Sequence, residues 1–171
     1  YITPEFPIKG VTVPLILALE QSGAAMIEIG IPFSDPLADG PTIQHSSEIA
    51  IKNGATLHRV LEIVKEVRSK TNIPLILMGY VNPMLNYGFE RFFADARTAG
   101  VDGLIVPDLP PEESKEFCLI SKKYELSTIF LIAPTSSHER IRRIDELSTD
   151  FTYCVSVTGV TGSRNGFGGD F

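Results

Sequence analysis

Short apolar runs recur along the chain, and each is followed by turn residues and then by a segment with helical periodicity. The runs are rich in Ile, Val and Leu, which is typical of buried parallel strands. They span residues 25–29, 74–78, 103–106, 128–132 and 153–157, and residues 1–3 look like the stub of a further strand. The amphipathic segments predict helices over residues 12–22, 41–70 with a break at Gly54, 89–99, 112–124 and 137–147. Strands that alternate with helices in this way predict an α/β fold with a parallel sheet.

Two α/β architectures fit this order of elements, a doubly wound open sheet and a closed (β/α)8 (TIM) barrel. Long segments rich in Gly and Pro follow several of the runs, at the strand end where a barrel builds its active site. A complete barrel needs eight βα units and about 250 residues. The chain has 171 residues. If it is a barrel, we expect a single partial domain over residues 1–171 that lacks the last two βα units.

Composition and charge narrow the class of partner. The chain is 43% hydrophobic and has a formal net charge of −6, with no run of Lys and Arg. A nucleic acid or a membrane surface is therefore not expected as a partner, which leaves a small molecule or another protein. Cys118 and Cys154 lie apart without metal-ligand spacing, which suits a reducing compartment.

Glu28 interrupts an apolar run at the start of the segment EIGIPFSDPLADGP. Side chains alternate along a strand, so Met26 and Glu28 share one face while Ile27 and Ile29 share the other. The two isoleucines can pack against helices, and Glu28 then points toward the interior near the end of the strand. A carboxyl group there has a raised pKa or a charged partner, and either outcome suits an acid or base. The alternative is a structural role, with a buried hydrogen-bond partner.

Asp39 follows Glu28 by eleven positions in a loop rich in turn residues. The loop is long enough to fold back over the strand end and to bring a second carboxylate to the same pocket. A turn-forming or capping role ahead of Pro41 is the alternative, and Asp35 has the same alternative. Asp108, in the loop after the third run, either shapes the mouth of the pocket or is a polar loop residue.

The other polar residues show no metal or nucleophile pattern. His45, His58 and His138 are scattered, so no metal site is expected. A GxSxG elbow is absent from the sequence. The glycine-rich stretch over residues 156–171 is either a lid whose amides bind an anion or a loose chain end.

Three segments resemble tryptophan synthase alpha chains. Residues 27–44, IEIGIPFSDPLADGPTIQ, are similar to the family's signature. Residues 104–110 with Glu112 and Glu113 resemble its fourth strand and loop, and residues 156–162 resemble its sixth loop. The resemblance implies a (β/α)8 barrel that cleaves indole-3-glycerol phosphate to indole and glyceraldehyde 3-phosphate without metal or organic cofactor. It also implies a tryptophan synthase beta chain as partner in an alpha2beta2 complex, and a cytoplasmic location.

The resemblance also implies residue roles at the matching positions. Glu28 would be the general acid and base, and Asp39 would accept a hydrogen bond from the indole N–H. The implied substrate-binding positions are Tyr1, Ile105 and Tyr153, with Thr161 in the lid and Gly162 as a backbone contact to the phosphate. The implied partner-facing positions are Pro32, Phe33, Asp35, Pro36, Asn82 and Pro83.

The chain also departs from the family pattern. Most of the first strand and the last two βα units have no counterpart, and residues 4–7, PEFP, differ from the family's Gly-Asp-Pro type of loop. We therefore expect a fragment of a longer protein, with a stub of strand 1 and with strands 2 to 6. Two other functions stay open, a stand-alone indole-3-glycerol-phosphate lyase and a non-catalytic interaction subunit.

Overall fold

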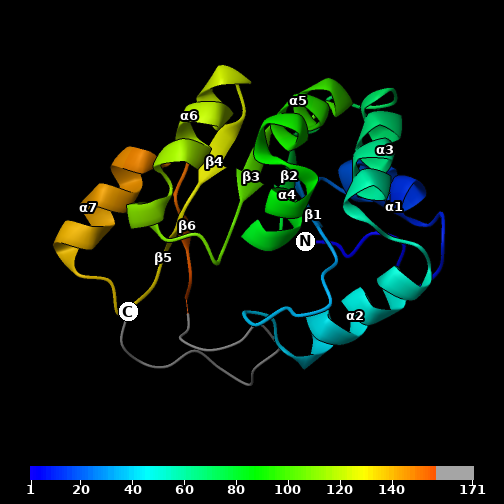
Figure 1. The fold of residues 1–171 in the computed structure, drawn as a ribbon. Helices are drawn as coiled ribbons and strands as arrows, with labels where there is room; N and C mark the ends of the chain where they lie inside the picture. Colours follow the sequence, from blue (N-terminus) through cyan, green and yellow to red (C-terminus); the bar gives the residue numbers. More distant parts are fainter. Residues whose placement is uncertain (157–171) are drawn as a thin grey trace.

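A row of parallel strands, in the order of the chain, organises the computed structural model, which describes residues 1–156 (Figure 1). One sheet contains β1 (Ile27–Gly30), β2 (Leu75–Met78), β3 (Gly103–Ile105) and β4 (Ser127–Ile129). A second parallel pair, β5 (Leu131–Ile132) and β6 (Tyr153–Cys154), follows β4 directly. Ile2 extends the row on the other side through a parallel bridge to Ile29. This is the strand order expected of consecutive βα units in a (β/α)8 barrel.

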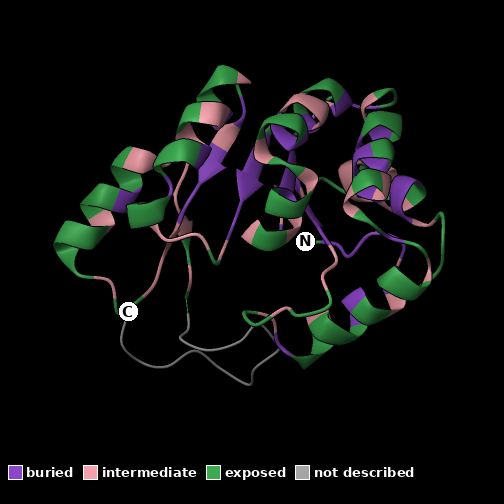
Figure 2. Cartoon of the chain, in the orientation of Figure 1, coloured by how far each residue is buried: buried purple, intermediate pink, exposed green. Residues whose placement is uncertain are grey.

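The helices are α1 (Thr12–Gln21), α2 (Pro41–Lys52), α3 (Leu57–Arg68), α4 (Val81–Tyr87), α5 (Phe89–Ala99), α6 (Lys115–Lys123) and α7 (His138–Leu147), with a 3-10 turn η1 (Pro111–Glu113) before α6. Most of the helices pack along the strands, whereas α2 lies apart from the strand row (Figure 1). Helix α3 contacts α1 and α5, and α5 contacts α6. The helices bury the side that faces the strands and expose the opposite side (Figure 2).

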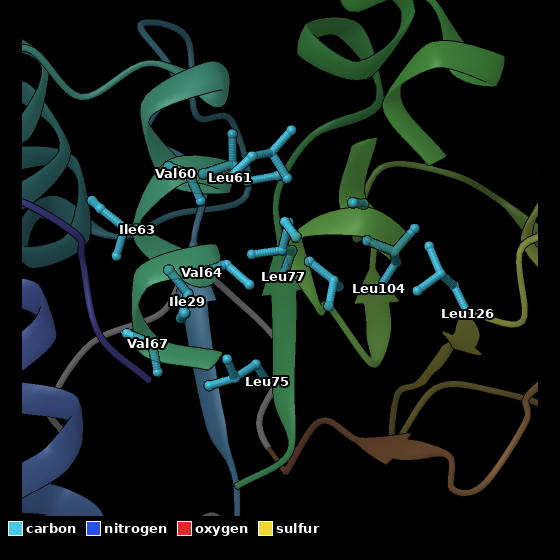
Figure 3. Close-up of a cluster of buried hydrophobic side chains, with 14 of the residues drawn as sticks. Ile29, Val60, Leu61, Ile63, Val64, Val67, Leu75, Leu77, Leu104 and Leu126 are labelled. Carbon is cyan, nitrogen blue, oxygen red and sulfur yellow. The ribbon is translucent and has the colours of Figure 1, made fainter. Parts of the chain in front are cut away.

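The two faces of the strand row bury different apolar clusters. On the outer face, Ile29, Leu75 and Leu77 pack against α3 side chains such as Val60 and Val64 (Figure 3). On the inner face, a smaller cluster joins three fully or almost fully buried isoleucines, Ile76, Ile105 and Ile129. Alternation along each strand separates the two clusters, because neighbouring residues point to opposite faces.

Most of the predicted helices and strands are present, with two differences. The predicted break at Gly54 is confirmed, because Gly54 has a positive φ of 92° and Thr56 caps α3 by accepting from the Arg59 N–H at 3.1 Å. The predicted strand over residues 128–132 divides at Phe130, whose N–H donates to the Ser148 hydroxyl at 3.1 Å instead of to a strand.

The second difference is α4, which the sequence did not predict. Its seven residues, VNPMLNY, lack a clear apolar period. The Val81 N–H donates to Asp108 Oδ1 at 2.9 Å, so a carboxylate from the loop after β3 satisfies the first turn of α4. A contact between residues distant in sequence thus stabilises this helix.

Glu5 forms a buried ion pair at the loop after the first strand segment. Its side chain is 1% exposed, and its Oε1 lies 3.0 Å from Arg59 Nε, on α3. The other carboxylate oxygen accepts from the Gly10 N–H, and the Glu5 carbonyl accepts from Asn53 at 2.7 Å. These contacts join the loop to α2 and α3, and they hold Glu5 at a positive φ of 57°.

We predict that Glu5→Gln destabilises the full-length protein by about 2 kcal/mol, because Arg59 loses its buried anionic partner. Glu62→Gln is the matched control, since Glu62 also contacts Arg59, at 3.2 Å, but is 50% exposed. The control should change stability by less than about 0.5 kcal/mol. Urea unfolding of both variants measures the difference, and equal effects would show that burial of the Glu5–Arg59 pair is not what stabilises the loop.

Candidate functional site

The register of β1 places Glu28 on the inner face of the strand row. Glu28 pairs with Ile76 of β2, and Ile27 and Ile29, on either side of it, are buried in the outer cluster. The Glu28 side chain is half-buried, at the second of the four positions of β1 and not at the strand's C-terminal end. This is the orientation that alternation along the strand predicts.

Tyr1 lies over the same end of β1, because Gly30 leaves room for its ring. A Cβ built at Gly30 would lie 2.8 Å from Tyr1 Cζ, closer than real Cβ contacts come. Desolvation raises the pKa of Tyr1 to about 12, and the charges of Asp39 and Glu28 add to this effect. The phenol therefore stays protonated at neutral pH, within electrostatic reach of both carboxylates.

Asp39 is positioned by the loop between β1 and α2. Its backbone N–H donates to the Pro36 carbonyl at 3.1 Å, and its own carbonyl accepts from Gln44 Nε2 at 2.9 Å. Burial raises the pKa of the Asp39 carboxyl, and the Tyr80 hydroxyl partly offsets this by stabilising the charged form. Asp39 is therefore a partly desolvated carboxylate with a tyrosine beside it.

Tyr80 is the site residue that the sequence analysis did not identify. It follows β2 directly, its hydroxyl accepts from the Ala38 N–H at 2.9 Å, and its ring lies 5.6 Å from that of Phe33. Desolvation, together with the charge of Asp39, raises its pKa, so the hydroxyl stays protonated. Tyr80 thus holds the loop that carries Asp39. The only sequence signal is a polar aromatic residue at the end of an apolar run.

Ile105 and Tyr153 belong to the inner face of the strand row. Ile105 is fully buried in the inner cluster, and Tyr153 packs against that cluster from β6. Burial raises the pKa of Tyr153, and the charge of Glu28 contributes. The charge of Glu28 thus acts on both Tyr1 and Tyr153, whereas Thr161 and Gly162 lie outside the described residues.

The expected partner-facing residues form one surface beside this pocket. Phe33, Asp35 and Asn82 line a hollow of about 380 Å³, together with Tyr80 and Asp108. Pro32 and Pro36 belong to the same loop and are partly exposed, and Asn82 and Pro83 lie in the first turn of α4. The loop that carries Asp39 thus also supplies part of an accessible surface.

Within residues 1–156, no group of three or more His, Cys, Asp or Glu side chains has the geometry to hold a metal ion. In the same part of the chain, no helix has the length and apolar character to cross a membrane.

Comparison with known proteins identifies the family. Residues 1–170 match the sequence profile described as "Tryptophan synthase alpha chain". The chain belongs to the tryptophan synthase alpha chain family. It is 57% identical over 164 residues to the tryptophan synthase alpha chain of Geotalea uraniireducens, covering 96% of this chain and 61% of the relative. The alpha chain of Chlorobium chlorochromatii is 50% identical, with 99% of this chain and 66% of the relative covered.

Solved structures show the same fold. A Mycobacterium tuberculosis tryptophan synthase chain superimposes with a TM-score of 0.89 at 39% identity, covering 96% of this chain and 64% of that one. A chain from the tryptophan synthase a2b2 complex of Pyrococcus furiosus gives a TM-score of 0.86 at 45% identity, covering 90% of this chain and 65% of that one. Against the first curated relatives, the chain spans less than two thirds of their length, 63% and 66%. The described strands are thus part of the family's (β/α)8 barrel.

The raised pKa of Asp39 leads to a prediction for stability. A carboxyl group whose folded pKa lies above its unfolded value favours folding at low pH, and this contribution is lost as the pH rises through the folded pKa. Asp39→Asn should therefore raise the melting temperature of the full-length protein at pH 8, and by less at pH 4. Asp35→Asn, in the exposed part of the same loop, is the control and should show no such trend. If the melting temperature of Asp39→Asn minus that of wild type is smaller at pH 8 than at pH 4, the raised pKa of Asp39 is contradicted.

Proposed function

We propose that the protein is the alpha subunit of tryptophan synthase and that it cleaves indole-3-glycerol phosphate to indole and glyceraldehyde 3-phosphate. The observation that carries this proposal is that Glu28, on β1, and Asp39, in the loop after it, both act through their charges on the same residue, Tyr1. Family membership supplies the substrate class, and the pocket supplies groups suited to the reaction. As for other members of this biosynthetic family, we place the reaction in the cytoplasm.

The reaction needs two proton transfers and one stabilised positive charge. Indole C3 gains a proton, which places a positive charge on the indole nitrogen. The glycerol hydroxyl next to C3 then loses its proton, and an electron pair of the oxygen forms the aldehyde C=O. The carbon–carbon bond breaks at the same time, and its electron pair neutralises the positive charge of the indole ring. Glu28 is placed to exchange protons at this position, and Asp39 is placed to stabilise the nitrogen charge.

The environment of each carboxyl group suits its proposed role. Asp39 is partly desolvated, so its charge interacts more strongly with a cationic ring than it would in bulk water. Tyr80 supports the charged form of Asp39 and holds the backbone at Ala38. The inner wall at Ile105 is apolar, which suits the indole ring. Thr161 and Gly162 stay proposed contacts for the lid and the phosphate.

We also propose a beta chain as the partner, in an alpha2beta2 complex. The loop that positions Asp39 also exposes Phe33 and Asp35, so a protein docked there would contact the segment that holds the catalytic carboxylate. The adjacent first turn of α4 adds Asn82 and Pro83 to the same surface. A partner at this surface would therefore affect the position of Asp39 directly.

One assay tests the activity. The full-length protein should release indole from indole-3-glycerol phosphate, and Glu28→Gln should lower kcat at least a thousandfold, because the amide keeps the shape of the side chain but exchanges no protons. Asp39→Asn should lower kcat more than it changes KM, since the amide still accepts the indole N–H but carries no charge. Retention of more than about a tenth of wild-type turnover in Glu28→Gln would contradict the acid and base role.

The same assay with and without a purified beta chain separates the candidate functions. An increase in the rate on addition of the beta chain supports the alpha subunit. A full rate that the beta chain leaves unchanged favours a stand-alone lyase, and binding of the beta chain without any turnover favours an interaction subunit.

A further inference from the structure

Gly103 occupies a crowded position on the inner face of the strand row. The register aligns Glu28 with Ile76 and Ile76 with Gly103, so the three residues form one row across β1, β2 and β3. Gly103 pairs in turn with Ser127 of β4. The next row toward the strand ends contains Met78, Ile105 and Ile129.

The neighbours of Gly103 fill the space that a side chain would need. A Cβ at this position would lie 3.0 Å from Ile76 Cδ1, 3.0 Å from Ser127 Cβ and 3.1 Å from Ile129 Cδ1. These distances are shorter than ordinary van der Waals contacts, so a methyl group would have to displace at least one neighbour. A side chain at position 103 is therefore accommodated only if a neighbour shifts by a few tenths of an ångström.

The neighbours differ in how they can respond. Ser127 Cβ is fixed by its own strand, and its hydroxyl donates to Asp150. The Cδ1 atoms of Ile76 and Ile129 are the ends of flexible side chains. The outer face behind them is filled by the cluster that packs on the helices, so these two side chains can move only along the inner face.

We propose that Gly103 sets the depth of the pocket for the aromatic ring of the substrate. Its missing side chain lets Ile76 and Ile129 sink toward β3, away from the space between Glu28 and Ile105. A methyl group at Gly103 pushes them back into that space and makes the pocket shallower. This inference rests on the proposed function, because it assigns the ring to the apolar end of the same pocket.

The depth of an apolar pocket determines which ring substituents fit. A single methyl group in such a pocket changes the discrimination between substrates by about tenfold to a hundredfold. Gly103→Ala should therefore lower kcat/KM for indole-3-glycerol phosphates that carry a methyl group on the six-membered ring more than for the parent substrate. We expect an extra loss of about tenfold for at least one methyl position among C4, C5, C6 and C7.

A compensating variant separates pocket depth from general damage. Ile129→Val removes one methyl group from the residue that Gly103→Ala displaces, so the double variant should return the ratio of kcat/KM values to within about twofold of wild type. Ile129→Val alone should favour the methylated substrates. Thermal unfolding of each full-length variant reports whether the fold is intact.

Each result has a defined meaning. Equal losses for parent and methylated substrates in Gly103→Ala, or a double variant whose ratio is not restored, would overturn the inference. If the wild-type protein releases no indole, the proposed function fails, and the pocket is then probed by calorimetric binding of indole and of the four ring-methylated indoles. In that case Gly103→Ala should weaken the binding of at least one ring-methylated indole more than the binding of indole itself. An unchanged ratio of these dissociation constants between wild type and Gly103→Ala would overturn the inference about Gly103, whatever the reaction of the protein.

Discussion

The alternation of side chains along β1 is the constraint on which the site depends. Ile27 and Ile29 must face the helices, because each is almost completely removed from solvent in the outer cluster. Burial of such a side chain stabilises the fold by about 1.5–3 kcal/mol. A shift of one residue would expose both isoleucines and place the Glu28 carboxyl among the helices. The apolar core thus fixes the direction of the Glu28 carboxyl, and the paired positions on β2 and β3 fix its height along the strand row.

The loop after β1 carries the second carboxyl, and it is held by one contact near in sequence and one that is distant. Tyr80 holds Ala38 and supports the charge of Asp39, and Gln44, on the first turns of α2, holds the Asp39 carbonyl. The two carboxyl groups therefore have different supports, one a strand and the other a loop tied to two neighbouring elements. The same loop exposes Phe33 and Asp35 on its other side, so the pocket and the proposed partner surface share a single segment. A displacement of the loop at Phe33 or Asp35 would therefore also move the part of the loop that carries Asp39.

Features set by periodicity were predictable from the sequence, and features set by distant contacts were not. The apolar runs predicted the strands, and alternation predicted the direction of Glu28. The break at Phe130 depends on a hydroxyl from Ser148, and α4 depends on Asp108, so neither has a local signal. Tyr80 acts through the loop residue Ala38, and Gly103 is crowded by residues of β2 and β4, so neither contact has a local sequence signal. The resemblance to the family supplied the substrate, which the residue pattern alone did not.

Glu28 and Asp39 are proposed to act on one substrate from two sides. A crystal structure of the full-length Glu28→Gln variant with indole-3-glycerol phosphate bound would locate the substrate against both residues. We expect the indole N–H within hydrogen-bond distance of the Asp39 carboxylate, with the residue 28 side chain beside C3 and the glycerol hydroxyl. An indole ring bound elsewhere in the barrel, or one whose nitrogen points away from Asp39, would contradict this proposal.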